Sequence, residues 1–212
     1  MTYSVIPIPN GKWKQNCYLV ADNSTGLSLV IDPGSDAHSI RLQLLHHSLT
    51  PVVILNTHAH YDHIGAVADL MESYKVPFFL NQADVKLMKQ ANIYKFLFDS
   101  KESVVIPENS HHLSDDGGIL KFAGFDVSVF CTPGHTKGST CLKIGTNLFS
   151  GDTLLPNGLG RTDLPGGDKF ALAQSVDLLR SLPFETKVWP GHGHSFSLGS
   201  LWEKLSQAGR PN

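Results

Sequence analysis

The segment THAHYDH, at residues 57–63, constrains this chain more than any other feature of its sequence. It follows the apolar stretch 51–55, so the sequence predicts a buried strand that ends in a loop rich in metal-binding side chains. Four such side chains stand within six positions: His58, His60, Asp62 and His63. A strand end of this kind can direct two imidazoles at one point and a carboxylate with a further imidazole at a neighbouring point. The spacing therefore favours two metal ions over one and indicates a metal-dependent enzyme.

The length and composition indicate one domain that spans residues 1–212. Hydrophobic residues make up 41% of the chain and charged residues 17%, which is typical of a globular protein. A chain of this length buries roughly 70% of its unfolded surface, which is enough for one large core. No proline-rich, glycine-rich or charged tract divides the sequence into parts.

The charge balance and the lack of long apolar runs narrow the range of partners. With 17 basic and 19 acidic residues and a pI near 6.6, the chain lacks the basic footprint of a nucleic-acid-binding protein. No apolar run reaches the roughly 18 residues that cross a bilayer, and the first residues do not resemble a secretion signal. Three cysteines without CxxC spacing are expected to be reduced and buried. We therefore expect a cytoplasmic protein that acts on a small molecule, with neither nucleic acid nor membrane as a partner.

Strands precede helices in each half of the chain. In the first half the pattern predicts strands at 3–8, 17–21, 27–31, 52–55 and 76–80, and helices at 35–47, 64–74 and through most of 81–98. In the second half it predicts strands at 119–122, 125–130, 140–144, 148–150 and 187–189, and helices at 169–181 and 198–208. This order predicts an α/β fold in which two sheets pack face to face with helices outside.

Three of the later strands also lead into a single metal-binding side chain. The strand at 125–130 leads into His135, the strand at 148–150 into Asp152, and the strand at 187–189 into His192. Each turn contains glycine, which lets the backbone approach a ligand closely. Because ligand sites in sheet proteins form at strand ends, we expect these three residues to meet the first cluster.

Together the seven residues make a chemically consistent set of ligands. Zinc accepts imidazole nitrogen and carboxylate oxygen, and manganese and iron accept the same atoms. The predicted sites are His58, His60 and His135 for one ion, and Asp62, His63 and His192 for the other. Asp152 would bridge the two ions, since one carboxylate can give an oxygen to each. The sequence thus predicts two divalent metal ions, by default zinc, that hold a hydroxide between them.

The motifs THAHYDH, TPGHTKGS, SGDTL and PGHG, in this order, resemble those of the metallo-β-lactamase fold superfamily across nearly the whole chain. Within that superfamily the sequence is most similar to the glyoxalase II-type (hydroxyacylglutathione) hydrolases. The resemblance implies a four-layer αβ/βα sandwich of two mixed sheets. It also implies a binuclear site and metal-ligand roles for all seven residues.

Two departures from the family pattern bear on the substrate. Asp152 stands where zinc β-lactamases of the superfamily carry cysteine or serine, which argues against antibiotic hydrolysis. Typical glyoxalase II enzymes continue into a helical domain that helps to bind glutathione, whereas 20 residues follow His192 here. We therefore expect a short, single-domain member without this contribution to glutathione binding.

Three further residues allow two interpretations each. Arg161 can pair with Asp163 and brace a glycine-rich loop, or it can bind the substrate. His194 lies two residues after His192 and could replace it as a ligand, although the PGH context favours His192. Asp32 follows a strand, where it can bind a metal or the backbone amides of a turn, and the turn role is the one we expect.

The leading hypothesis is a hydrolase in which a hydroxide bridging two metal ions attacks a thioester or a related ester bond. Asp62 would both bind one metal and orient the nucleophile. The main alternative is a dioxygenase that acts on a persulfide with one iron, held by His58, His135 and Asp152. A third hypothesis is an inactive metal protein that serves as a binding scaffold, but no expected ligand is missing from the sequence.

Overall fold

Six strands from the first half of the chain form the first sheet of this computed structural model, which describes residues 3–108, 110–113 and 117–208. In spatial order they are β1 (Tyr3–Asn10), β2 (Gln15–Asp22), β3 (Leu27–Ile31), β4 (Thr50–Leu55), β5 (Phe78–Asn81) and β6 (His111–Leu113). Neighbours from β1 to β3 are antiparallel, and neighbours from β3 to β6 are parallel. Because β3, β4 and β5 run in the same direction, the loops that follow them meet at one edge of the sheet.

Six strands from the second half form the second sheet. In spatial order they are β14 (Phe196–Ser197), β13 (Lys187–Pro190), β10 (Asn147–Gly151), β9 (Thr140–Ile144), β8 (Phe125–Cys131) and β7 (Gly118–Phe122). Strands β10 and β13 are parallel, and all other neighbours are antiparallel. Strands β8, β10 and β13 therefore end at the same edge. A small two-stranded sheet, β11 (Leu154–Leu155) with β12 (Gly158–Leu159), follows β10 in the chain.

The two sheets pack face to face, because alternate side chains of each strand point to opposite faces. On β2, Tyr18 and Val20 pack against the second sheet, while Leu19 packs toward the helices on the other side. From the second sheet, Val127 and Phe149 contribute to the same layer between the sheets. This layer forms one of the apolar clusters that support the strand ends.

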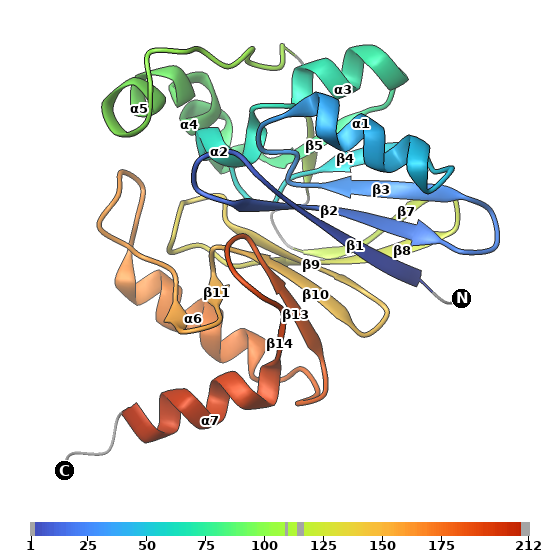
Figure 1. Ribbon diagram of the computed structural model, residues 1–212. Helices are drawn as coiled ribbons and strands as arrows, with labels where there is room; N and C mark the ends of the chain where they lie inside the picture. Colours follow the sequence, from blue (N-terminus) through green and yellow to red (C-terminus); the bar gives the residue numbers. More distant parts are fainter. Residues whose placement is uncertain (1–2, 109, 114–116, 209–212) are drawn as a thin grey trace.

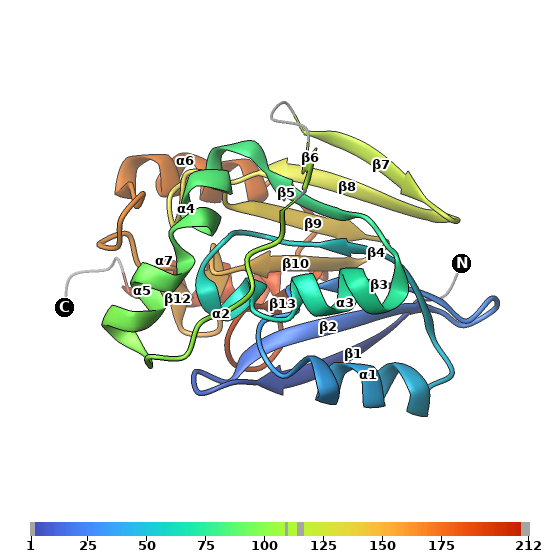
Figure 2. The ribbon, with the colours of Figure 1, turned by 90° about the horizontal axis from the view of Figure 1, so that it is seen from above.

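Helices cover the outer face of each sheet, as Figures 1 and 2 show. These helices are α1 (Ala37–His46) and α3 (Val67–Tyr74) on the first sheet, and α6 (Lys169–Leu179) and α7 (Leu198–Ala208) on the second. Ile40 and Leu70 pack beneath the first pair, and Val176 and Leu201 beneath the second. The predicted α/β fold, a four-layer αβ/βα sandwich, is confirmed.

Several element boundaries differ from those predicted. Helix α1 begins at Ala37, two residues later than predicted, because Asp36 caps it: the side chain of Asp36 accepts a hydrogen bond from the amide of Ser39 at 3.0 Å. The predicted helix 64–74 is two helices, α2 (Tyr61–Ile64) and α3. The break occurs because the amide of Ala66 donates to the carbonyl of Pro33 at 3.0 Å instead of continuing the helical ladder. The segment 81–98 contains the 3₁₀ turn η1 (Gln82–Asp84), α4 (Val85–Lys89) and α5 (Ala91–Phe98).

The described residues bear on two expectations, one about membrane-spanning helices and one about the cysteines. None of the helices in residues 3–108, 110–113 and 117–208 is long and apolar enough to cross a membrane. Cys17 and Cys141 are buried as predicted, whereas Cys131 is only partly buried. Burial raises the pKa of the Cys17 thiol well above its ordinary value and that of the Cys141 thiol to about 12. Both thiols are therefore protonated at neutral pH and take part in packing.

Candidate metal centre

Four of the seven predicted residues lie where the first sheet ends. Strand β4 ends at Leu55, and the single turn of α2 begins at Tyr61. The residues on and between these elements include His58, His60, Asp62 and His63. The buried side chain of Asn56 closes this loop, because its Nδ2 donates to the carbonyl of His63 at 2.8 Å. The loop therefore holds a fixed shape that presents all four side chains on one side.

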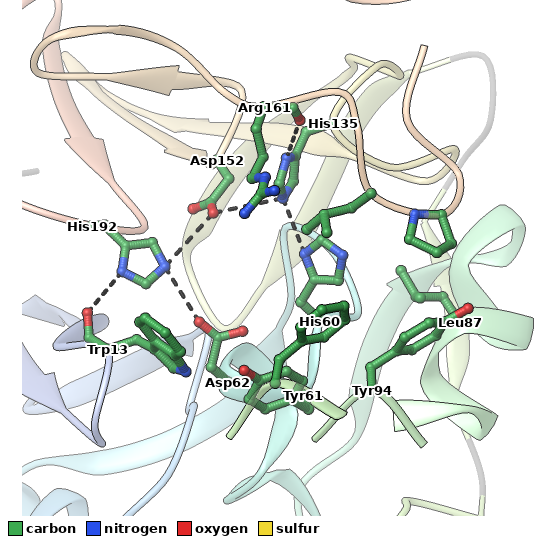
Figure 3. A pocket seen from close by; sticks show the side chains of 13 residues that line it. Trp13, His60, Tyr61, Asp62, Leu87, Tyr94, His135, Asp152, Arg161 and His192 are labelled. Atoms are coloured by element: carbon green, nitrogen blue, oxygen red, sulfur yellow. Dashed lines mark hydrogen bonds and ion pairs between the residues drawn. The ribbon is translucent and has the colours of Figure 1, made fainter. Parts of the chain in front are cut away.

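The other three predicted residues come from the second sheet. His135 follows β8, Asp152 follows β10, and His192 follows β13. Figure 3 shows these side chains facing His60 and Asp62 across one pocket. The structure thus brings residues from both sheets together at the shared edge.

Three imidazole nitrogens face one another in what we call the first group: His58, His60 and His135. Nδ1 of His60 lies 3.1 Å from Nε2 of His58 and 3.0 Å from Nε2 of His135. The ligand atoms of the three residues all lie within 4.8 Å of one another. The first group therefore has the donor atoms and the spacing of a three-imidazole metal site.

A second group, Asp62, His63 and His192, lies beside the first. Nε2 of His192 lies 3.3 Å from Oδ2 of Asp62, and Nε2 of His63 lies 4.0 Å from the same oxygen. The ligand atoms of these residues also lie within 4.8 Å of one another. His63 is fully buried, whereas the side chains of Asp62 and His192 are 17% and 29% exposed. The second group therefore opens toward the pocket.

Asp152 stands between the two groups. Its Oδ2 lies 3.6 Å from Nε2 of His135 and 3.6 Å from Nε2 of His192, and its Oδ1 lies 3.6 Å from Nε2 of His63. The backbone of Gly191 packs against this carboxylate, and a Cβ at that position would collide with Oδ1. The carboxylate therefore occupies the position that a bridging ligand requires.

Two buried atoms of this cluster have no hydrogen-bond partner among the residues described. They are Nε2 of His63 and Oδ1 of Asp152. Leaving a buried polar atom without a partner costs about 1–3 kcal/mol. A divalent cation satisfies both atoms, because imidazole nitrogen and carboxylate oxygen are donors that such cations accept. The residues present therefore fit the metal ions that the sequence predicts.

Backbone carbonyls fix the orientation of two of the rings. Nδ1 of His135 donates to the carbonyl of Arg161 at 2.8 Å, and Nδ1 of His192 donates to the carbonyl of Trp13 at 3.1 Å. A carbonyl only accepts, so Nδ1 carries a proton in both rings and Nε2 is the atom that faces the centre. The sequence did not predict these contacts, because any residue type supplies a backbone carbonyl.

The side chain of Asp32 connects two loops, which differs from the local turn contacts that we expected. Its Oδ1 accepts from the amide of Thr57 at 2.7 Å and its Oδ2 from the hydroxyl of Thr57 at 2.6 Å, although Thr57 lies 25 residues further along the chain. Oδ2 also lies 3.0 Å from Nδ1 of His63, where it orients that ring. Asp32 lies close enough to His58 and His63 to be considered a ligand itself. Because both of its oxygens are already hydrogen-bonded, we assign it the orienting role.

Burial keeps two rings of the first group, His58 and His60, neutral. Burial and the nearby ring of His63 hold the pKa of His58 well below its ordinary value. Burial and the ring of His135 lower the pKa of His60 to about 4. Neutral imidazoles have the lone pairs that a metal ion needs, so these two rings can bind an ion without losing protons.

The second group is charged instead. Burial opposes charge on His63, but the carboxylates of Asp62 and Asp152 outweigh it and raise the pKa of His63 to about 9. Burial also acts to raise the pKa of Asp62, but the rings of His63 and His192 lower it well below its ordinary value. Without a cation, a protonated His63 therefore balances the carboxylates of this group.

Arg161 and His194 are two of the residues for which the sequence allowed two interpretations. Nε and Nη2 of Arg161 donate to the two carboxylate oxygens of Asp163, at 2.8 and 2.6 Å, so the predicted ion pair is present. The side chain of Arg161 also lines the pocket, and its contact with a substrate stays a prediction. His194 is exposed and belongs to neither group.

A family model described as the metallo-beta-lactamase superfamily matches residues 10–192, a range that contains both groups and Asp152. The chain belongs to the metallo-β-lactamase superfamily. The resemblance that the four sequence motifs indicated is thereby confirmed, together with the sandwich fold that it implied.

Relatives within the metallo-β-lactamase superfamily align over nearly their whole lengths. The probable metallo-hydrolase YqgX of Bacillus subtilis is 35% identical over 191 residues, which is 88% of each chain. The hydroxyacylglutathione hydrolase GloC of Haemophilus influenzae is 31% identical over 215 residues, which is 94% of each chain. Among solved structures, the BLEG-1 B3 metallo-β-lactamase is 32% identical with a TM-score of 0.88, over 94% of this chain and 97% of the other. TTHA1623, solved in a di-iron-bound form, is 35% identical with a TM-score of 0.84, over 92% and 96%.

The buried carboxylate of Asp84 connects the loops that carry the candidate ligands of this superfamily member. The sequence did not indicate this role. Oδ2 of Asp84 accepts from the amide of Ala59 at 3.0 Å and from the hydroxyl of Thr136 at 2.8 Å, and Oδ1 accepts from the amide of Gly138 at 2.7 Å. Ala59 lies within THAHYDH, and the other two partners lie within TPGHTKGS. Asp84 thus connects the two loops that supply the first group.

We expect an Asp84→Ala variant to lose about 3 kcal/mol of unfolding free energy, because three donors would lose their acceptor in a buried site. Urea denaturation of the chelator-treated protein measures this loss. The matched control is Asp126→Ala, which removes an exposed carboxylate paired with Lys121 and should change stability by less than about 0.5 kcal/mol. Equal losses in the two variants would contradict the connecting role of Asp84.

Proposed function

We propose that this chain is a hydrolase that binds two divalent metal ions and cleaves a thioester or a related ester bond of a small molecule. The observation that carries the proposal is the position of Asp152, whose two oxygens face ring nitrogens of both groups. The unsatisfied buried atoms of Asp152 and His63 support it. The hydroxyacylglutathione hydrolase relative supports the reaction class, and the di-iron-bound neighbour supports the number of ions.

Each group would hold one ion. The proposed ligands are His58, His60 and His135 for the first ion, and Asp62, His63 and His192 for the second. Asp152 would give one oxygen to each. Zinc is the default for this donor set, and iron or manganese fits it as well.

When bound, two divalent ions would supply an activated water and polarise the scissile carbonyl. The carboxylate of Asp62 faces the pocket and stays deprotonated, so it can accept a hydrogen bond from the attacking water and orient it. The departing thiolate is stable enough to leave without a strong general acid. Tyr61 is poorly suited to act as that acid, because burial and the charge of Asp62 raise its pKa to about 12.

Elemental analysis of freshly purified protein, combined with a substrate panel, tests the proposal. The panel contains a small thioester, a lactone, a phosphodiester and a β-lactam. We expect two metal ions per chain and hydrolysis of the thioester. One iron per chain with oxygen consumed in the presence of a persulfide would favour the dioxygenase alternative instead.

We further expect zinc binding to release a proton from His63 at about pH 7.5. The pKa of this ring in the metal-free protein is about 9, above its unfolded value near 6.5, so the ring is protonated at that pH. Its contribution to the stability of the metal-free protein is accordingly full below about pH 6.5 and is lost as the pH rises through 9. Calorimetric zinc titrations in buffers of different ionisation enthalpy count the released proton. A repeat at about pH 10, where His63 is already neutral, is the control, and equal release at both pH values would contradict the assignment.

A further inference from the structure

The pocket beside the two groups has an aromatic side. It encloses about 330 Å³. Besides the candidate ligands, its lining includes Trp13, Tyr61, Leu87, Tyr94 and Phe98. Figure 3 shows Trp13, Tyr61 and Tyr94 across the pocket from Asp152. A substrate carbonyl placed at the two groups would therefore direct one of its arms toward these rings.

Two of these rings are about half exposed to solvent, and a bound ligand could cover them. The side chains of Trp13 and Phe98 are 48% and 51% exposed. Tyr94 and Phe98 stand four residues apart on α5, so both rings lie on the same face of that helix, toward the pocket. Half-exposed aromatic side chains that gather around a cavity are typical of a site for an apolar ligand.

The one arginine in the lining of the pocket and the lysines beside its rings are paired with carboxylates. Among the described residues that line it, Arg161 is the only lysine or arginine, and its guanidinium makes two hydrogen bonds to Asp163. Two lysines lie near the aromatic rings, Lys12 beside Trp13 and Lys95 beside Tyr61. Their ammonium groups lie 3.1 and 2.9 Å from the carboxylate of Asp99. A carboxylate on the substrate arm would therefore meet no unpaired lysine or arginine in the described lining of this pocket. Lys86 and Lys137 line a neighbouring hollow instead.

We propose, building on the hydrolase function above, that this pocket selects thioesters with an uncharged aromatic or bulky apolar arm over thioesters whose arm carries carboxylates. Trp13, Tyr94 and Phe98 would determine this preference by covering the apolar arm. A peptidic thiol with two carboxylates, such as glutathione, would have to leave its charges in solvent.

A matched pair of thioethers tests the preference without any turnover. The probes are the S-methyl thioethers of 2-phenylethanethiol, whose arm is aromatic and uncharged, and of glutathione, whose arm carries two carboxylates. Neither contains a carbonyl at sulfur, so neither can be hydrolysed there. Calorimetry with the zinc-loaded protein should show that the uncharged thioether binds about 10-fold more tightly.

Two variants of α5 show whether the rings cause the preference. Phe98→Ala should weaken binding of the 2-phenylethanethiol thioether about 10-fold. Phe96→Ala is the matched control, because this ring stands on the same helix, is 62% exposed, and does not line the pocket. Both positions are exposed, so neither variant threatens the fold.

The outcomes separate this proposal from the hydrolase function. Equal or tighter binding of the glutathione thioether, or equal effects of Phe98→Ala and Phe96→Ala, would overturn the proposed preference even if thioesters are hydrolysed. Conversely, if the preference is seen but the acetyl thioester of N-acetylcysteamine is not hydrolysed, the pocket assignment stands and the proposed reaction fails.

Discussion

An Asp62→Ala variant should hydrolyse its thioester substrate about 1,000-fold more slowly than the wild-type protein. The substitution removes a proposed metal ligand and also the carboxylate that orients the attacking water. The fold should remain, because the side chain lies at the pocket surface, 17% exposed, and its carboxylate faces the rings of His63 and His192. Initial rates at saturating substrate measure the loss, and far-ultraviolet circular dichroism checks the fold.

The control for this prediction is Asp177→Ala on α6. That carboxylate is 77% exposed and forms an ion pair with Arg180 at the end of the same helix, so its loss should leave turnover within about two-fold of wild type. If Asp62→Ala retained wild-type turnover, the proposed role of this carboxylate in the reaction would be wrong.

Replacing His192 should remove one of the two metal ions, whereas replacing His194 should remove neither. Nε2 of His192 lies 3.3 Å from Oδ2 of Asp62 and 3.6 Å from Oδ2 of Asp152, but His194 is exposed and outside both groups. We therefore expect His192→Ala to bind about one ion per chain and to lose about 100-fold or more in turnover. His194→Ala should match the wild type in both respects. Elemental analysis after dialysis, paired with rate measurements, compares the two variants.

These two histidines are a matched pair, since they lie two positions apart in the sequence and belong to the same loop. The opposite result, with metal lost only in His194→Ala, would show that the loop rearranges to use the second ring. It would also remove the support that the PGH context gives to His192.

The main part of the candidate site was predictable, because its donors are side chains at strand ends. His135, Asp152 and His192 are distant in sequence, yet each follows a strand of the second sheet. Parallel strand directions bring such ends to one edge, so residue type and strand position were sufficient to predict that they meet. Asp32 and Asp84 also follow strands, but acids after strands are common in turns, and only the structure shows that they hold other site residues in place.

The features that the sequence could not predict are of two kinds. Some depend on backbone atoms, which every residue has, and others are strands too short to show an alternating pattern. The carbonyls of Trp13 and Arg161 orient two rings, and no residue type marks a carbonyl. Strands β6, β11, β12 and β14 have two or three residues each, which is shorter than the alternation that identifies a strand. The break before α3 was missed for the same kind of reason, because it depends on a long-range bond from Ala66 to Pro33.

The division of the seven residues between the sheets affects how the two halves of the molecule hold together. His58, His60, Asp62 and His63 belong to the first half, and His135, Asp152 and His192 to the second, so neither half has the donors for a complete pair of cations. Each bound ion would act as a noncovalent crosslink between the sheets, much as a disulfide joins distant parts of a chain. A chelator would then loosen the sandwich as a whole, and the stability of this protein would vary with the metal supply around it.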